Sequence, residues 1–126
     1  MISTNSFTTE GFCPVVRNSQ FLCAFITPSP IYAPGPVKEM KRHNDTDEVF
    51  VLLEGKAVLL TRDSLEEECL VTPISPLTAY TVHAGTWHYL AVSQDAKVFV
   101  TESGALKREN TDTQDVREEN IVAFLP

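Results

Sequence analysis

Two apolar segments separated by one tight turn are the feature that most constrains the fold of this chain. Residues 48–53 and 56–61 are apolar at nearly every position, and Glu54 and Gly55 lie between them. Apolar runs this short favour strands over helices, and glycine supplies the positive φ that a two-residue turn needs. We therefore expect a β-hairpin whose strands are covered on both faces, as in a closed barrel with an oligomer contact or a packed outer sheet.

The rest of the chain repeats this pattern of short strands. Residues 28–36 contain four prolines and a glycine, which predicts a loop or an extended edge and excludes a central strand. No stretch has the periodicity of an amphipathic helix, so the pattern predicts an all-β sandwich or barrel. Further strands are expected at 21–27, 69–72 and 78–82, in a pair formed by 87–92 and 97–102, and in a docking segment at 121–125.

Length and charge limit the classes of function. A chain of 126 residues indicates one domain, here residues 1–126. A net charge of −7 disfavours nucleic acid and anionic membrane as partners, because both attract basic surfaces. We find neither a signal peptide nor an apolar run long enough to cross a bilayer. The three cysteines lack metal-site spacing and are typical of reduced thiols, so we expect a cytoplasmic protein.

A histidine and a carboxylate precede the first apolar segment. His43 and Glu48 are separated by residues 44–47, and on one straight strand this spacing would turn their side chains to opposite faces. The Asn-Asp-Thr-Asp sequence between them suits a turn, which lets His43 end one strand and Glu48 begin the next. His88 follows Gly85 at the start of a later strand and can join them. Imidazole and carboxylate groups bind divalent first-row metals and leave coordination positions open for substrate or water.

This spacing resembles the two sequence motifs of the cupin superfamily. The first motif is His-x-His, a gap of three or four residues, Glu, six residues and Gly. His43, Glu48 and Gly55 fit it, whereas Lys41 stands in place of the first histidine. The second motif is Pro-x-Gly-x-x-His-x-x-x-Asn, of which residues 83–92 keep the glycine and the histidine but not the proline and the asparagine.

The resemblance implies a fold and a metal site. The fold is a single-domain, all-β cupin-type jelly-roll barrel with its core at about residues 38–102. The implied ligands of one divalent transition metal ion (Zn, Fe, Mn or Ni) are His43, Glu48 and His88. We also expect a homodimer, for two reasons. Some strands are apolar on both faces, and a proline-rich arm could cover the edge of a partner's sheet.

Lys41 is the candidate catalytic residue. An ammonium group is repelled by a divalent cation and cannot ligate it while protonated. Lys41 can therefore point to solvent, bind an anionic group of a substrate, or act as a base with a lowered pKa. His83 takes the position of the motif proline, so we expect a turn or surface role for it.

Each candidate ligand also has a plain structural alternative. His43 can be an exposed loop residue, His88 a core histidine with satisfied hydrogen bonds, and Glu48 a surface carboxylate at a strand end. Two functions stay open. One is a lyase, isomerase or dioxygenase that acts on a small polar metabolite, such as a carboxylated or ureido compound, with the metal as Lewis acid. The other is a non-catalytic module that binds a small molecule with or without metal.

Overall fold

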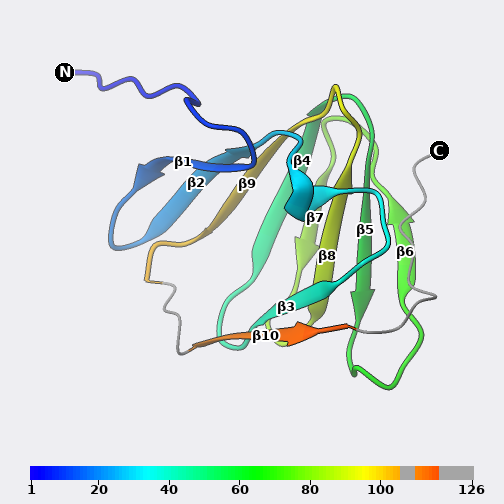
Figure 1. Ribbon diagram of the computed structural model, residues 1–126. Helices are drawn as coiled ribbons and strands as arrows, with labels where there is room; N and C mark the ends of the chain where they lie inside the picture. Colours follow the sequence, from blue (N-terminus) through cyan, green and yellow to red (C-terminus); the bar gives the residue numbers. More distant parts are fainter. Residues whose placement is uncertain (106–109, 117–126) are drawn as a thin grey trace.

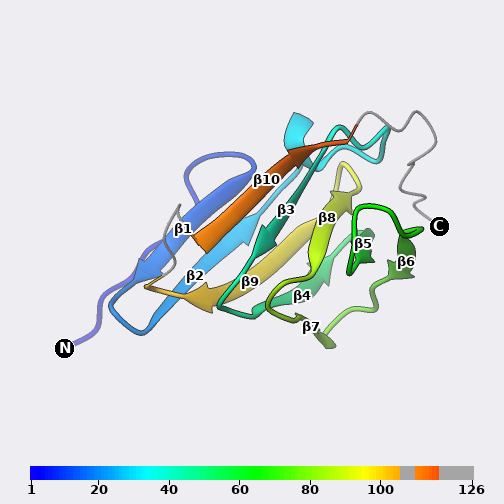
Figure 2. The ribbon, with the colours of Figure 1, turned by 90° about the horizontal axis from the view of Figure 1, so that it is seen from below.

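Two antiparallel β-sheets make up the body of the protein (Figures 1 and 2). The computed structural model describes residues 1–105 and 110–116. In sheet order, the first sheet contains β1 (Phe12–Arg17), β2 (Phe21–Ile26), β9 (Lys97–Ser103), β4 (Glu48–Glu54) and β7 (Ala79–Val82). The second contains β10 (Thr111–Asp115), β3 (Glu39–His43), β8 (Trp87–Val92), β5 (Ala57–Arg62) and β6 (Leu70–Pro73).

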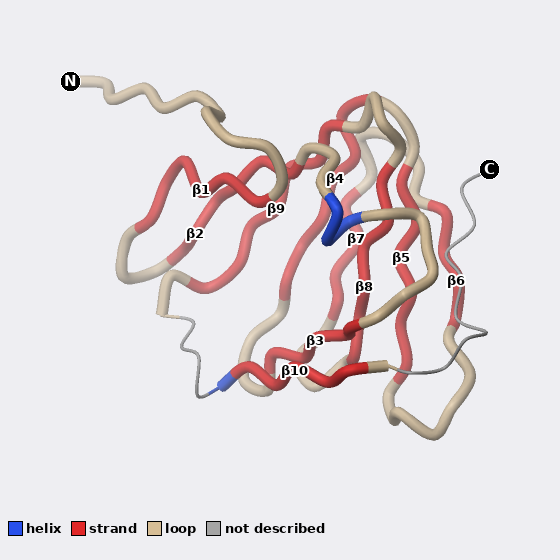
Figure 3. The backbone as a smooth tube through the Cα atoms, viewed as in Figure 1, coloured by secondary structure: helices blue, strands red, loops and turns tan. Residues whose placement is uncertain are grey.

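The proline-rich loop contains one 3-10 turn, η1 (Pro30–Tyr32) (Figure 3). The described residues contain no helix long and apolar enough to cross a membrane. The N-terminal residues 1–10 are exposed and extend away from the sheets (Figure 1). The prediction of an all-β jelly-roll barrel is thus confirmed.

The predicted hairpin at Gly55 is wrong, although both of its strands are present. β4 pairs with β7 and β9, whereas β5 pairs with β6 and β8, so the chain crosses from one sheet to the other at Gly55. The expected pair 87–92 and 97–102 is wrong for the same reason, because β8 and β9 belong to different sheets. An apolar pattern identifies a strand but not its partner.

The two crossings lie against each other. The backbone amide of Lys56 donates to Ser93 Oγ at 2.9 Å, and the amide of Ser93 donates to the Lys56 carbonyl at 2.9 Å. Gly55 has a φ of +77°, and a Cβ atom added to it would lie 2.6 Å from Ala96 Cα. Glycine is therefore required here both for its backbone conformation and for the close approach of the second crossing.

Two strands were not predicted from the sequence. β10 is rich in polar residues, and β1 contains Pro14, next to which the pairing with β2 shifts register. β3 is also polar and was expected only as a strand that ends at His43, which it does. The expected strands at 21–27, 69–72 and 78–82 agree with β2, β6 and β7 to within one residue at each end. The docking segment expected at 121–125 lies outside the described residues.

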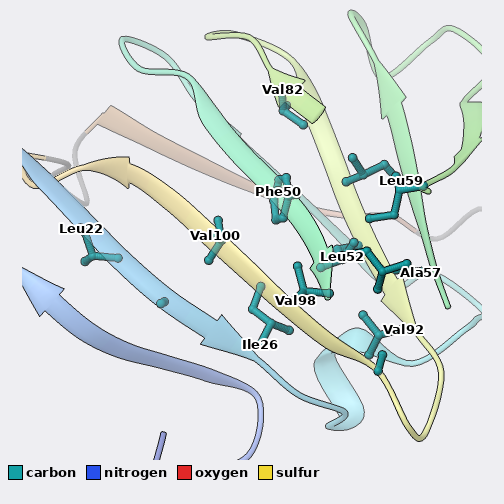
Figure 4. Close-up of a cluster of buried hydrophobic side chains, with 14 residues drawn as sticks. Leu22, Ile26, Phe50, Leu52, Ala57, Leu59, Val82, Val92, Val98 and Val100 are labelled. Atoms are coloured by element: carbon teal, nitrogen blue, oxygen red, sulfur yellow. The ribbon is translucent and has the colours of Figure 1, made fainter. Parts of the chain in front are cut away.

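The main core fills the space between the sheets (Figure 4). Leu52, Val98 and Val100 are at most 1% exposed, and burial of a side chain of this size stabilises the fold by roughly 1.5–3 kcal/mol. Inward-facing residues alternate along β4 and β9, and each of these two apolar rows continues into a glutamate. The glutamates are Glu48 and Glu102, which face each other in the pairing of these strands.

A second cluster covers the other face of β5, which is buried at every position except the half-buried Thr61. It includes Met40, Leu60 and Trp87. The expectation that both faces are covered therefore holds for β5, whereas β4 exposes Leu53.

Candidate metal centre

A cavity of about 690 Å³ is lined by residues of both sheets and of the loop that carries η1. Phe12, Ile26, Phe50 and Leu90 contribute apolar surface to it. All the sequence-predicted site residues, His43, Glu48, His88 and Lys41, line the same cavity.

The structure brings His43, Glu48 and His88 together. His43 is the last residue of β3 and Glu48 the first of β4, so the four residues between them form the expected turn. His88 Nε2 lies 3.1 Å from Glu48 Oε1, and His43 Nε2 lies 3.7 Å from Glu48 Oε2. One potential ligand atom from each residue lies within 4.8 Å of the others. Glu48 and His88 are buried, and the His43 side chain is only 11% exposed, which argues against the exposed-loop and surface alternatives for His43 and Glu48.

Hydrogen bonds on the far side of each imidazole orient the two rings. His88 Nδ1 lies 3.1 Å from the Thr86 carbonyl oxygen, which can only accept, so Nδ1 carries a proton. Nε2, which faces Glu48, is therefore the atom of this ring that can bind a metal ion once it gives up its own proton. His43 Nδ1 lies 3.0 Å from Thr111 Oγ1 on β10. Contacts of this kind hold metal-binding histidines in the orientation that their ligand role requires.

The Glu48 carboxyl is held in its charged form. Burial raises its pKa, but hydrogen bonds with His43, His88 and Glu102 outweigh burial and hold that pKa well below its usual range. Glu102 behaves in the opposite way. Burial, together with the hydrogen bond to Glu48 and the charge of Glu48, raises the pKa of Glu102 to about 9.

Glu102 is the residue that sequence reasoning missed. Glu48 and Glu102 are cross-strand neighbours, and Glu102 Oε2 lies 3.7 Å from His43 Nε2. This oxygen is buried and has no hydrogen-bond partner among the described residues. Glu102 could have been found from the alternation of side chains along β9. It follows Val98 and Val100 at intervals of two residues and therefore shares their inward face.

Lys41 lies beside His88, its partner in the pairing of β3 with β8. Paired residues share a face of a sheet, and Lys41 lines the cavity while staying exposed. Its charge lowers the pKa of Glu102, although burial and Glu48 outweigh this effect.

His83 is not part of the cluster. Its side chain is 77% exposed, and its Nδ1 atom lies 3.6 Å from Asp47 Oδ2. Asp47 also accepts a hydrogen bond from the Ala84 amide at 2.9 Å, in keeping with a turn-forming role.

The donor set fits a divalent transition metal. Two imidazole Nε2 atoms and a charged carboxylate converge in a buried position, and these are the ligand types that such ions favour. The unpartnered oxygen of Glu102 beside them is a further sign that a positive charge suits this position.

The comparisons with known proteins identify the fold. No protein-family model and no curated protein matches the chain. Among solved structures, a cupin-2 domain containing protein from Shewanella frigidimarina is similar, with 18% identity and a TM-score of 0.56 over 77% of this chain and 84% of that one.

Two longer proteins contain a similar unit. CapF, a capsular polysaccharide assembling protein from Staphylococcus aureus, is 18% identical with a TM-score of 0.61, over 89% of this chain and 31% of CapF. HppE, solved with Fe(II) and its substrate, is 14% identical with a TM-score of 0.58, over 71% of this chain and 47% of HppE. The chain thus spans about a third of CapF and about half of HppE. With its two antiparallel sheets and these structural likenesses, this chain has the cupin fold.

Proposed function

We propose that the protein binds one divalent transition metal ion through His43, Glu48 and His88 and acts as a metal-dependent enzyme on a small molecule. The observation that carries the proposal is the convergence of three potential ligand atoms within 4.8 Å on the wall of a cavity. Zn, Fe, Mn and Ni are all compatible with nitrogen and oxygen ligands. That HppE, a protein of similar fold, was solved with Fe(II) and substrate supports this proposal.

The chain's own residues would divide the work of such a site. When bound, the ion would act as a Lewis acid that polarises a substrate carbonyl or stabilises an enolate. Glu48 supplies a negative charge, and the Thr86 carbonyl keeps the proton of His88 on Nδ1. Lys41 Nζ, on the exposed part of the cavity lining, would bind an anionic group of the substrate or transfer a proton.

The cavity indicates the class of substrate. Its volume of about 690 Å³ falls within the range of roughly 300–1,000 Å³ that is usual for small-molecule sites. Apolar side chains such as Phe12 and Phe50 line it together with charged side chains of both signs, which are Lys38, Lys41, Glu39, Glu48 and Glu102. A small molecule with an apolar part and an anionic group placed at the lysines matches these surfaces.

Metal content tests the proposed ligands. Purified wild type, His83→Ala and the double variant His43→Ala/His88→Ala would be loaded with Zn, Mn, Fe or Ni in turn, freed of excess metal and analysed for elements. We expect about one ion per chain in wild type and in His83→Ala, where the substituted histidine is exposed and outside the cluster. The double variant should hold none. Equal metal content in all three proteins would refute the assignment.

A second candidate function is non-catalytic binding of a small molecule. It is favoured by Lys41 at the position where the cupin motif has a ligand histidine, because the site then has one motif ligand fewer. In that case the metal-free protein would keep its affinity for the small molecule. An enzyme of the proposed kind would lose turnover on metal removal and regain it when metal is added back.

A further inference from the structure

We infer that Glu102 is a fourth ligand of the metal ion, together with His43, Glu48 and His88. The inference rests on the proposed function, since it concerns the same site. It adds a residue from β9, a strand that contributes none of the three ligands expected from the sequence motifs.

Strand pairing places the Glu102 side chain at the cluster. In the register of β4 and β9, Glu102 lies directly opposite Glu48, so both side chains face the interior. The Glu102 side chain is 6% exposed, and its Oε2 atom lies 3.7 Å from His43 Nε2. That separation equals the distance between His43 Nε2 and Glu48 Oε2.

These separations are close to those of ligands that share one ion. With metal–ligand bonds of about 2.0–2.2 Å, neighbouring ligand atoms lie roughly 3–3.5 Å apart. In this site the distances are 3.1 Å between His88 Nε2 and Glu48 Oε1 and 3.7 Å from His43 Nε2 to Glu48 Oε2 and to Glu102 Oε2. A shift of the Glu102 side chain by a few tenths of an ångström would bring its Oε2 atom to this separation from His43 Nε2.

The Oε2 atom of Glu102 has no hydrogen-bond partner that would explain its buried position in the part of the chain that the structure describes. Glu102 Oε2 is buried and unpartnered among the described residues, and a buried polar atom in that condition is costly. A divalent ion at this position would satisfy the oxygen.

Lys41 explains why the fourth ligand would come from another strand. It occupies the motif position of a histidine on β3 and cannot ligate while protonated. A second carboxylate from β9 would restore a four-ligand site with two imidazoles and two carboxylates. Such a set neutralises a divalent ion and favours oxygen-preferring ions such as Mn²⁺ more than a three-ligand set does.

The test is titration of the metal-free protein with Co²⁺ alone, because its visible absorption reports ligand number and geometry. Glu102→Gln removes the charge at nearly constant volume. Glu54→Gln is the matched control, since Glu54 is an exposed carboxylate at the other end of β4, paired with Lys97. We expect Glu102→Gln to lower the affinity for Co²⁺ and to alter the absorption spectrum. Loss of a residue that only supports a metal ligand lowers affinity by about 10–100-fold, so loss of a ligand should cost no less than this. Glu54→Gln should match wild type in both.

The outcomes separate this inference from the proposed function. An unchanged spectrum in Glu102→Gln, whether or not affinity falls, would overturn the fourth ligand and leave the three-ligand site intact. Failure of wild type to bind Co²⁺, or full binding by His43→Ala/His88→Ala, would overturn both.

A measurement on unaltered protein makes the result independent of how the variant folds. The number of waters on bound Mn²⁺ can be counted from the broadening of its EPR signal in ¹⁷O-enriched water. For six-coordinate Mn²⁺, four protein ligands leave about two waters. A count of about three would overturn the assignment of Glu102.

Discussion

Lys41 sits beside His88 at a position where the resembled motif has a ligand. Its ammonium group should oppose a bound cation and attract an anionic substrate. We predict that Lys41→Gln strengthens Zn²⁺ binding on the order of fivefold, equivalent to roughly 1 kcal/mol of relieved repulsion. Competition with a chelating dye would measure this, and Lys97→Gln, which removes an exposed charge paired with Glu54, is the control. Weaker binding in Lys41→Gln would show instead that the lysine supports the metal.

At this scale, sequence spacing was a good guide to residues that are close along the chain. His43 and Glu48 are joined by a short turn whose Asn and Asp residues could be read directly. His88 was found through its offset from Gly85. Glu102 was not found, because its place opposite Glu48 depends on the register of two strands distant in sequence. No local pattern encodes that register, although the alternation of β9 does predict that Glu102 points inward.

At the scale of elements, the crossing at Gly55 is the most constrained turn. Gly55 and Gly85 have similar φ angles, +77° and +83°. An alanine at either position costs about 1–3 kcal/mol for the left-handed backbone. Only at Gly55 would the new Cβ collide, with the backbone of Ala96, whereas nothing lies within 4 Å of a Cβ at Gly85.

We therefore predict that Gly55→Ala lowers the free energy of unfolding more than Gly85→Ala does, by roughly a further 1–3 kcal/mol from the overlap. Urea denaturation of the two variants and of wild type measures both losses. Equal losses would mean that the crossing at Gly55 does not pack as closely against the crossing between β8 and β9 as described.

Strands were predicted best where they are apolar and worst where they are polar. β5 and β8 are easy to recognise in the sequence as apolar runs, because nearly every residue in them is buried. β3 and β10 are not, because β3 carries the charged residues of the cavity rim and β10 is a polar edge strand that pairs with it. The error at Gly55 has a different origin. A tight glycine turn between two apolar strands describes a hairpin and a crossing between sheets equally well, and only tertiary packing distinguishes them.

At the scale of the whole molecule, the two-sheet arrangement connects the core to the site. The rows of inward-facing residues on β4 and β9 are apolar along most of their length (Figure 4). Each row ends in a carboxyl group, Glu48 on β4 and Glu102 on β9. The proline-rich loop, expected to cover a partner's edge, lines the cavity of its own chain with Pro30, Ile31 and Tyr32. Homodimerisation and a cytoplasmic location remain predictions.

Crystals grown from metal-loaded protein would show directly whether His43, Glu48 and His88 bind a metal ion. Data collected on either side of the absorption edge of the bound metal locate the ion by its anomalous signal. We expect one strong peak about 2.0–2.2 Å from His43 Nε2, His88 Nε2 and a Glu48 oxygen. A peak bound by other residues, or none at full metal loading, would contradict the assignment of this cluster as the metal centre.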